Sequence, residues 1–92
     1  VHEPVHKEDA MKKETLEKVF EYASKPVHGT MSRKLRKDIR LQVNEGEVYE
    51  GAVLFLGEEF VRVTSEKDGQ AVNTYYDWER IASVRTYGPG PE

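Results

Sequence analysis

The feature that most constrains this fold is a strand-like run at residues 48–56 with a glycine near its centre. Its residues are apolar at both odd and even positions, so neither side of the extended chain is suited to water. Gly51 interrupts the run, and a glycine inside a strand commonly marks a bulge or a sharp bend. We therefore expect the strand to bend at Gly51, so that each half serves a different sheet surface.

Short apolar runs alternate with turn residues on both sides of this segment. Residues 35–43 alternate, with an apolar set that Lys37 interrupts on one parity and mostly charged residues on the other. Lys67, Asp68 and Gly69 are typical of a hairpin turn. Further strands are expected at 60–65, 70–77 and 81–87. Together these runs predict a mainly β domain, a five-stranded and strongly bent antiparallel barrel over residues 35–87.

An amphipathic helix is expected before the barrel, over residues 9–24. Asp9 is a suitable N-cap residue, and Pro26 ends the helix. The apolar stripe of this helix has the spacing i, i+3, i+4 and i+7 and consists of Leu16, Val19, Phe20 and Ala23. One helix has no core of its own, so the stripe should pack on the barrel. Residues 1–8 and 88–92 are expected to be flexible tails, and residues 1–10 are either native or derived from a tag.

Composition narrows the setting to a single cytoplasmic domain. The 92 residues include no cysteine, which excludes disulfides and thiolate chemistry and favours a reducing compartment. No apolar run of about 18 residues exists to span a membrane, and the N-terminus lacks a signal-peptide pattern. The hydroxyl residues have no histidine or lysine partner at catalytic spacing, and no phosphate-binding loop is present. We therefore expect a protein that is not an enzyme and has no cofactor.

Charge is divided unevenly along the chain, although the net charge is only −3. Residues 33–44 are basic and residues 45–59 are acidic. The basic residues predicted to bind RNA phosphates are Arg33, Lys34, Arg36, Lys37 and Arg40. Tyr75 and Tyr76 are the predicted base-stacking residues, with packing in the core as the alternative. Because adjacent strand residues point in opposite directions, at least one of these two tyrosines must face inward.

Two segments resemble the Sm-like proteins, a superfamily that includes the bacterial Hfq branch. Residues 43–63 (VNEGEVYEGAVLFLGEEFVRV) are similar to the family's first motif, and residues 75–84 (YYDWERIASV) to its closing strand. The resemblance implies a small barrel, a homo-oligomer and contact with RNA. Departures occur where the family's base-reading residues are expected: Gly57 replaces an acidic residue, Val61 or Arg62 an asparagine, and Ala82-Ser83 an arginine-glycine pair.

The sequence is also compatible with two other functions. SH3-like and Tudor-like barrels share the same pattern and bind peptides, so a protein-interaction barrel is the first alternative. The second is a weak divalent-cation site, because carboxylates are the ligands that calcium and magnesium accept. The carboxylates considered for it are Glu58, Glu59, Asp77 and Glu79.

Overall fold

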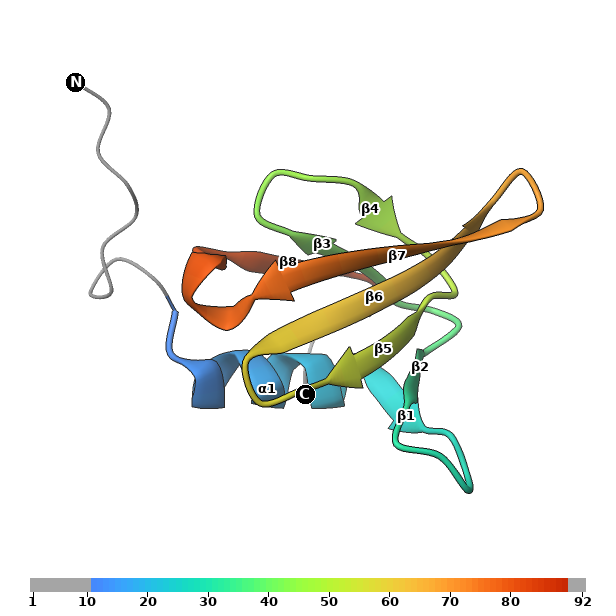
Figure 1. Ribbon diagram of the computed structural model, residues 1–92. Coiled ribbons are helices and arrows are strands. Elements are labelled where there is room, and N and C mark those ends of the chain that lie inside the picture. The colour runs from blue at the N-terminus through green and yellow to red at the C-terminus, as the bar shows by residue number, and fades with distance from the viewer. Residues whose placement is uncertain (1–10, 90–92) are drawn as a thin grey trace.

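The computed structural model describes residues 11–89 and shows one α-helix followed by short strands and a 3-10 helix (Figure 1). In chain order the elements are α1 (Lys13–Tyr22), β1 (Ser24–Pro26), β2 (Arg33–Leu35), β3 (Arg40–Val43), β4 (Val48–Tyr49), β5 (Val53–Leu56), β6 (Phe60–Lys67), β7 (Gln70–Asp77), η2 (Trp78–Arg80) and β8 (Val84–Tyr87). The mainly β class with one leading helix is confirmed. Among residues 11–89, no helix has the length and apolar character needed to cross a membrane.

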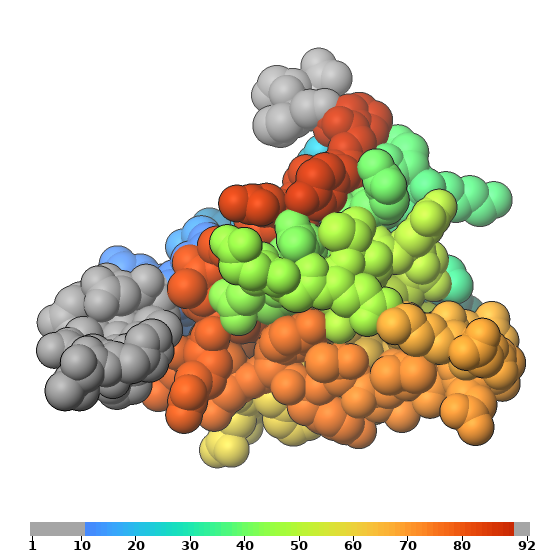
Figure 2. Space-filling view, turned by 90° about the horizontal axis from the view of Figure 1, so that it is seen from above, coloured from blue at the N-terminus to red at the C-terminus, as the bar shows by residue number. Residues whose placement is uncertain are grey.

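Hydrogen bonding divides the strands into two antiparallel sheets. One has five strands in the order β1-β2-β5-β6-β7, and the other has three in the order β4-β3-β8. The long β6–β7 hairpin runs across the molecule, and helix α1 lies below the sheets in Figure 1. Seen from above, the β3–β4 hairpin (green) lies beside β7 (orange) (Figure 2). Buried residues of both sheets belong to one core.

The bend predicted at Gly51 is confirmed. The strand-like run is split, because β4 belongs to the three-stranded sheet and β5 to the five-stranded sheet. Gly51 has φ +66°, in the left-handed region that side chains disfavour, and a Cβ built there meets no atom within 4 Å. The requirement for glycine at this bend is therefore one of backbone conformation and not of space.

Helix α1 is shorter than the predicted range. It begins at Lys13, with Lys12 as its N-cap, and the predicted N-cap, Asp9, lies outside the described residues. It ends at Tyr22, and Ser24–Pro26 form strand β1 instead of a last helical turn. The predicted stripe is confirmed in part. Leu16, Phe20 and Ala23 are buried, whereas Val19 is half-buried.

The strand predicted over residues 35–43 is interrupted. Leu35 ends β2, and β3 begins only at Arg40, after a turn in which the Ile39 amide donates to the Arg36 carbonyl (3.1 Å). Residues 27–32 form the loop of a β1–β2 hairpin. In that loop the Thr30 amide bonds the Val27 carbonyl at 3.1 Å. Strand alternation alone did not reveal either feature, because the apolar parity of Leu35 resumes in phase at Ile39, and the exposed Lys37 is the only interruption within the turn.

The later strands agree more closely with expectation. Strand β7 matches its predicted range, and β6 extends two residues further than predicted. Asp68 and Gly69 both have positive φ, as a tight hairpin turn requires. The last strand starts at Val84 and not at residue 81. The Asn44 side chain accounts for the delay, because its Oδ1 accepts the amides of Ala82 (2.8 Å) and Ser83 (3.3 Å) before the β3–β8 ladder begins.

The core lies between the two sheets and helix α1. It contains Leu16, Phe20, Ala23, Leu35, Ile39, Leu41, Val43, Tyr49, Ala52, Leu54, Val61, Val63, Trp78 and Ile81. The Phe20 and Trp78 rings meet edge to face at a centroid distance of 5.9 Å, which joins the helix to η2. The indole N–H of Trp78 donates to the Gly57 carbonyl (2.9 Å), so this buried polar group is satisfied.

Candidate nucleic-acid interface

A surface hollow near the C-terminal end of α1 gathers four basic side chains. It has a volume of about 540 Å³ and is lined by Lys25, Pro26, Lys34, Leu35, Arg36, Lys37 and Asp38. We call it the basic hollow. Lys25 lies directly opposite Lys34 in the β1–β2 ladder. Like charges directly opposite one another repel, so an anion in this hollow would relieve that repulsion.

Two of the predicted phosphate-binding arginines are engaged within the fold. Arg33 Nε donates to Ser24 Oγ (2.8 Å), and Arg33 Nη2 donates to the Glu21 carbonyl (3.1 Å). Arg36 Nε donates to the Tyr22 carbonyl (2.8 Å). The last carbonyls of a helix have no intrahelical donors, so these guanidinium groups complete the C-terminal end of α1. Among the predicted cations, Lys34 and Lys37 are the ones exposed at the basic hollow.

Arg40 lies apart from the other predicted basic residues. It belongs to β3 in the three-stranded sheet, and its guanidinium stands 5.7 Å from the centroid of the Tyr87 ring. The turn between β2 and β3 carries the chain from one sheet to the other. Arg40 is not among the residues that line the basic hollow, although it follows Lys37 by three residues.

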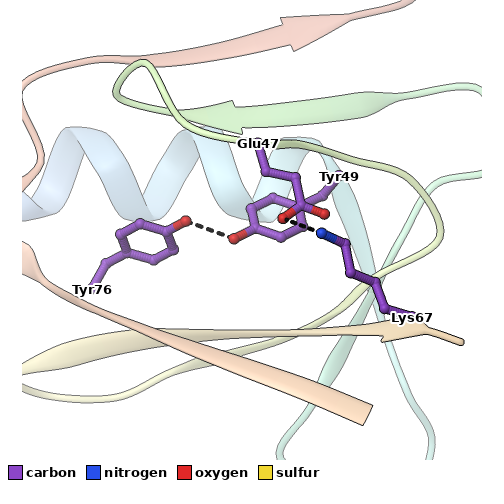
Figure 3. Close-up of polar contacts among 4 residues, drawn as sticks. All are labelled: Glu47, Tyr49, Lys67 and Tyr76. Atoms are coloured by element: carbon purple, nitrogen blue, oxygen red, sulfur yellow. Dashed lines mark hydrogen bonds and ion pairs between the residues drawn. The ribbon is translucent and has the colours of Figure 1, made fainter. Parts of the chain in front are cut away.

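The two predicted stacking tyrosines point to opposite faces of β7, as strand alternation requires. Tyr75 faces outward and is 61% exposed. Tyr76 faces inward, where its hydroxyl lies 2.6 Å from the hydroxyl of Tyr49 on β4 (Figure 3). The ion pair between Lys67 and Glu47 (3.5 Å) joins the same two sides of the molecule. Tyr76 therefore links the two sheets, and only Tyr75 presents its ring to solvent.

The environment of Tyr76 disfavours its ionised form. Burial raises the pKa of Tyr76 far above its ordinary value, and the hydrogen bond with Tyr49 and the nearby Glu47 carboxylate raise it further. The Tyr76 hydroxyl is consequently neutral in the folded protein, and its hydrogen bond with Tyr49 joins the two sheets.

The outer face of the five-stranded sheet carries further residues that sequence reasoning missed. Phe55, Arg62 and Tyr75 are direct cross-strand neighbours on β5, β6 and β7. Phe60 lies next to them, with ring centroids 6.1 Å from Phe55 and 5.6 Å from Tyr75. A usable signal was present, because Val61 and Val63 as the inward pair require Phe60 and Arg62 to face outward.

Comparison with protein-family models, with curated proteins and with solved structures finds no significant match to this chain.

A second hollow, of about 410 Å³, holds the acidic residues considered for a cation. It is lined by Lys13, Glu58, Glu59, Asp77, Trp78 and Glu79. Lys13 Nζ donates to the Glu58 carbonyl (2.7 Å) and stands 5.8 Å from the Trp78 ring centroid, so a cationic side chain already occupies this place. Among residues 11–89, no three metal-ligating side chains are grouped to hold an ion.

Proposed function

We propose that this protein is a non-enzymatic module that binds RNA through the basic hollow. The observation that carries the proposal is the convergence of Lys25, Lys34 and Lys37 on one concave surface. None of the three lysines forms an ion pair with another described residue, so their charges are available to an external polyanion. Phosphate groups are suited to such a site, because each contact releases condensed counterions.

The resemblance to Sm-like proteins supports a more specific form of this proposal, in which the two sheets are the halves of one Sm/SH3-like barrel. No backbone ladder between described strands joins the two sheets. The Tyr49–Tyr76 hydrogen bond and the Glu47–Lys67 ion pair connect them through side chains. The barrel would assemble as a homo-oligomer. Strands β7 and β8 are sheet edges whose backbone groups are open to pairing with a second copy.

Charge reversal in the basic hollow tests the RNA proposal. In fluorescence anisotropy with a labelled oligouridine, Lys34→Glu with Lys37→Glu should weaken binding at least tenfold. The slope of log affinity against log salt should become shallower by about 1 to 2, because roughly two phosphate contacts are lost. The matched control is Lys12→Glu with Lys18→Glu, which reverses two exposed lysines, one at the N-cap of α1 and one within that helix. Equal effects of the two double variants would contradict a defined site.

A protein-interaction barrel is the second candidate, favoured by the exposed aromatic rings of Phe60 and Tyr75. A peptide gripped by these rings would bind with little dependence on salt and would be indifferent to Lys34→Glu with Lys37→Glu. Titrations of oligouridine and of a proline-rich peptide at two salt concentrations therefore separate the two functions.

A further inference from the structure

The outer face of the five-stranded sheet has a cluster whose composition the fold itself does not require. Phe55, Arg62 and Tyr75 form one row across three strands, and Phe60 contacts the Phe55 and Tyr75 rings. We call these four residues the aromatic cluster. The inward residues of the same strands supply the core, so the outward rings add no burial to it. Tyr75 and Phe60 instead expose 61% and 37% of their surface to solvent.

Arg62 is the unusual member of this cluster. Its guanidinium carbon lies 5.3 Å from the centroid of the Phe55 ring, which orients the group across the sheet surface. Its Nε is shielded from solvent, yet it has no hydrogen-bond partner among the described residues. A ligand oxygen cannot reach an atom that water cannot reach, so a phosphate would be bound by the terminal Nη groups of this half-buried, permanently charged guanidinium.

Charge and polarity along the same face favour a nucleic acid as the occupant. The neighbouring cross-strand row contains Lys25, Lys34, Val53, Thr64 and Asn73. It therefore leads from the basic hollow to Asn73, which lies two residues before Tyr75 on β7. Thr64 Oγ1 donates to Asn73 Oδ1 (2.7 Å), which leaves the Asn73 amide nitrogen as a donor toward solvent. The acids of this face, Glu66 and Asp77, lie at its two ends, opposite Ala71 and Phe60.

We propose that the aromatic cluster stacks unpaired bases of single-stranded RNA, with the phosphate beside the stacked base held by Arg62. This inference rests on the proposed function and adds the substrate class, because a duplex keeps its bases stacked inside and cannot offer their faces to Tyr75 and Phe60. Base stacking on aromatic side chains tolerates any sequence, so the strand is held without strict base reading. From the cluster, the backbone continues along the Thr64–Lys34 row toward the basic hollow.

The test is anisotropy with a labelled oligouridine of about 8 nucleotides, a length typical of single-strand sites. Tyr75→Ala should weaken binding roughly tenfold with an unchanged salt slope, because stacking is lost without any change of charge. Arg62→Gln should weaken binding and reduce the slope by about 1, because one phosphate contact is lost. Tyr75→Phe, which keeps the ring, and Tyr22→Ala, which removes an exposed tyrosine on α1, should bind as wild type.

An abasic oligomer of the same length separates stacking from charge. Tyr75→Ala should bind it as well as the wild type does, whereas Arg62→Gln should still bind it more weakly. One result would overturn the stacking site and leave the basic hollow standing. In that result Tyr75→Ala and Arg62→Gln bind oligouridine as tightly as wild type, whereas the double variant Lys34→Glu with Lys37→Glu binds it more weakly. If the wild type binds no oligouridine, both proposals are overturned. Circular dichroism of each variant checks that the fold is retained.

Discussion

At the scale of single residues, the contact between Tyr49 and Tyr76 has the clearest energetic consequence. One hydroxyl comes from each sheet, and their 2.6 Å separation joins strands that share no ladder. An orphaned hydroxyl in this half-buried position costs stability, because its hydrogen bond with water has also been lost. The pair therefore holds the two sheets together through side chains.

A pH-dependent stability follows from the raised pKa of Tyr76. The folded-state pKa of Tyr76 is above the unfolded value of about 10. The stability contributed by its neutral hydroxyl is therefore complete below that pH and is lost as the pH rises toward the folded-state pKa. Tyr76→Phe should lower the free energy of unfolding by about 1 kcal/mol at neutral pH, because a hydrogen bond is lost. The variant should not show the fall in stability at high pH that comes from ionisation of Tyr76. Urea unfolding followed by circular dichroism at about pH 8 and about pH 11 measures both effects. A variant whose stability falls as steeply as that of the wild type would contradict this assignment.

Gly51 gives a second prediction at this scale. Gly51→Ala should destabilise the protein by about 1–2 kcal/mol, because an alanine at φ +66° is strained even with open space around its Cβ. Gly51→Asn should lose less stability than Gly51→Ala, since asparagine tolerates left-handed conformations. Thermal melts of both variants provide the measurement, and equal losses would point to a steric cause instead.

At the scale of elements, the C-terminal end of α1 depends on residues of β2 and of the turn after it, and not on basic residues of its own. Its last turn contains no basic residue, and Arg33 and Arg36 from outside the helix bond the carbonyls of Glu21 and Tyr22. Two arginines of the segment predicted to bind a polyanion, Arg33 and Arg36, thus support the helix instead. The helix, the β1–β2 hairpin and the turn after β2 are held as one unit.

Substitution of Arg33 separates that structural role from ligand binding. Arg33→Ala should cost about 1–3 kcal/mol, because it removes charged hydrogen bonds to Ser24 and Glu21 and leaves Ser24 without that donor. Lys34→Ala, which changes the next, exposed residue, should leave the free energy of unfolding within about 0.5 kcal/mol of wild type. Urea titrations compare the two. Similar losses would show that Arg33 does not support the helix.

Sequence reasoning succeeded where one local rule decides the structure, and failed where tertiary contacts do. The Gly51 bend, the Asp68-Gly69 turn and the inward face of β7 follow from backbone conformation and strand parity. The break after Leu35 does not, because Ile39 resumes the buried parity of Leu35, and the exposed Lys37 is the only interruption between them. Within the candidate site, the lysines were visible as charges. The use of Arg33 and Arg36 by the helix depends on contacts between distant residues.

At the scale of the whole molecule, the open strand edges determine how copies can associate. Strand β7 borders one sheet and β8 borders the other, and the exposed Val72 and Tyr87 lie on them. If β7 of one copy pairs with β8 of the next, the contact is head-to-tail and closes into a ring when the rotation permits.

Light scattering tests this assembly. We expect a single species with several times the 10.6 kDa mass of the chain, as a closed ring requires. Val72→Lys, which introduces a charge on the β7 edge, should shift the mass toward that of one chain, because a charge there opposes edge pairing. A wild-type mass of one chain at all concentrations would contradict the oligomer. The proposed RNA-binding surface would then act in a single copy.

The buried indole offers a practical consequence beyond packing. Trp78 is the chain's sole tryptophan, and it lies in the core against Phe20, away from the outer sheet face. Its emission should report loss of the core on unfolding and remain insensitive to ligands on the outer face. Intrinsic fluorescence can therefore measure the stability of every variant with or without an added oligonucleotide, and no label is needed.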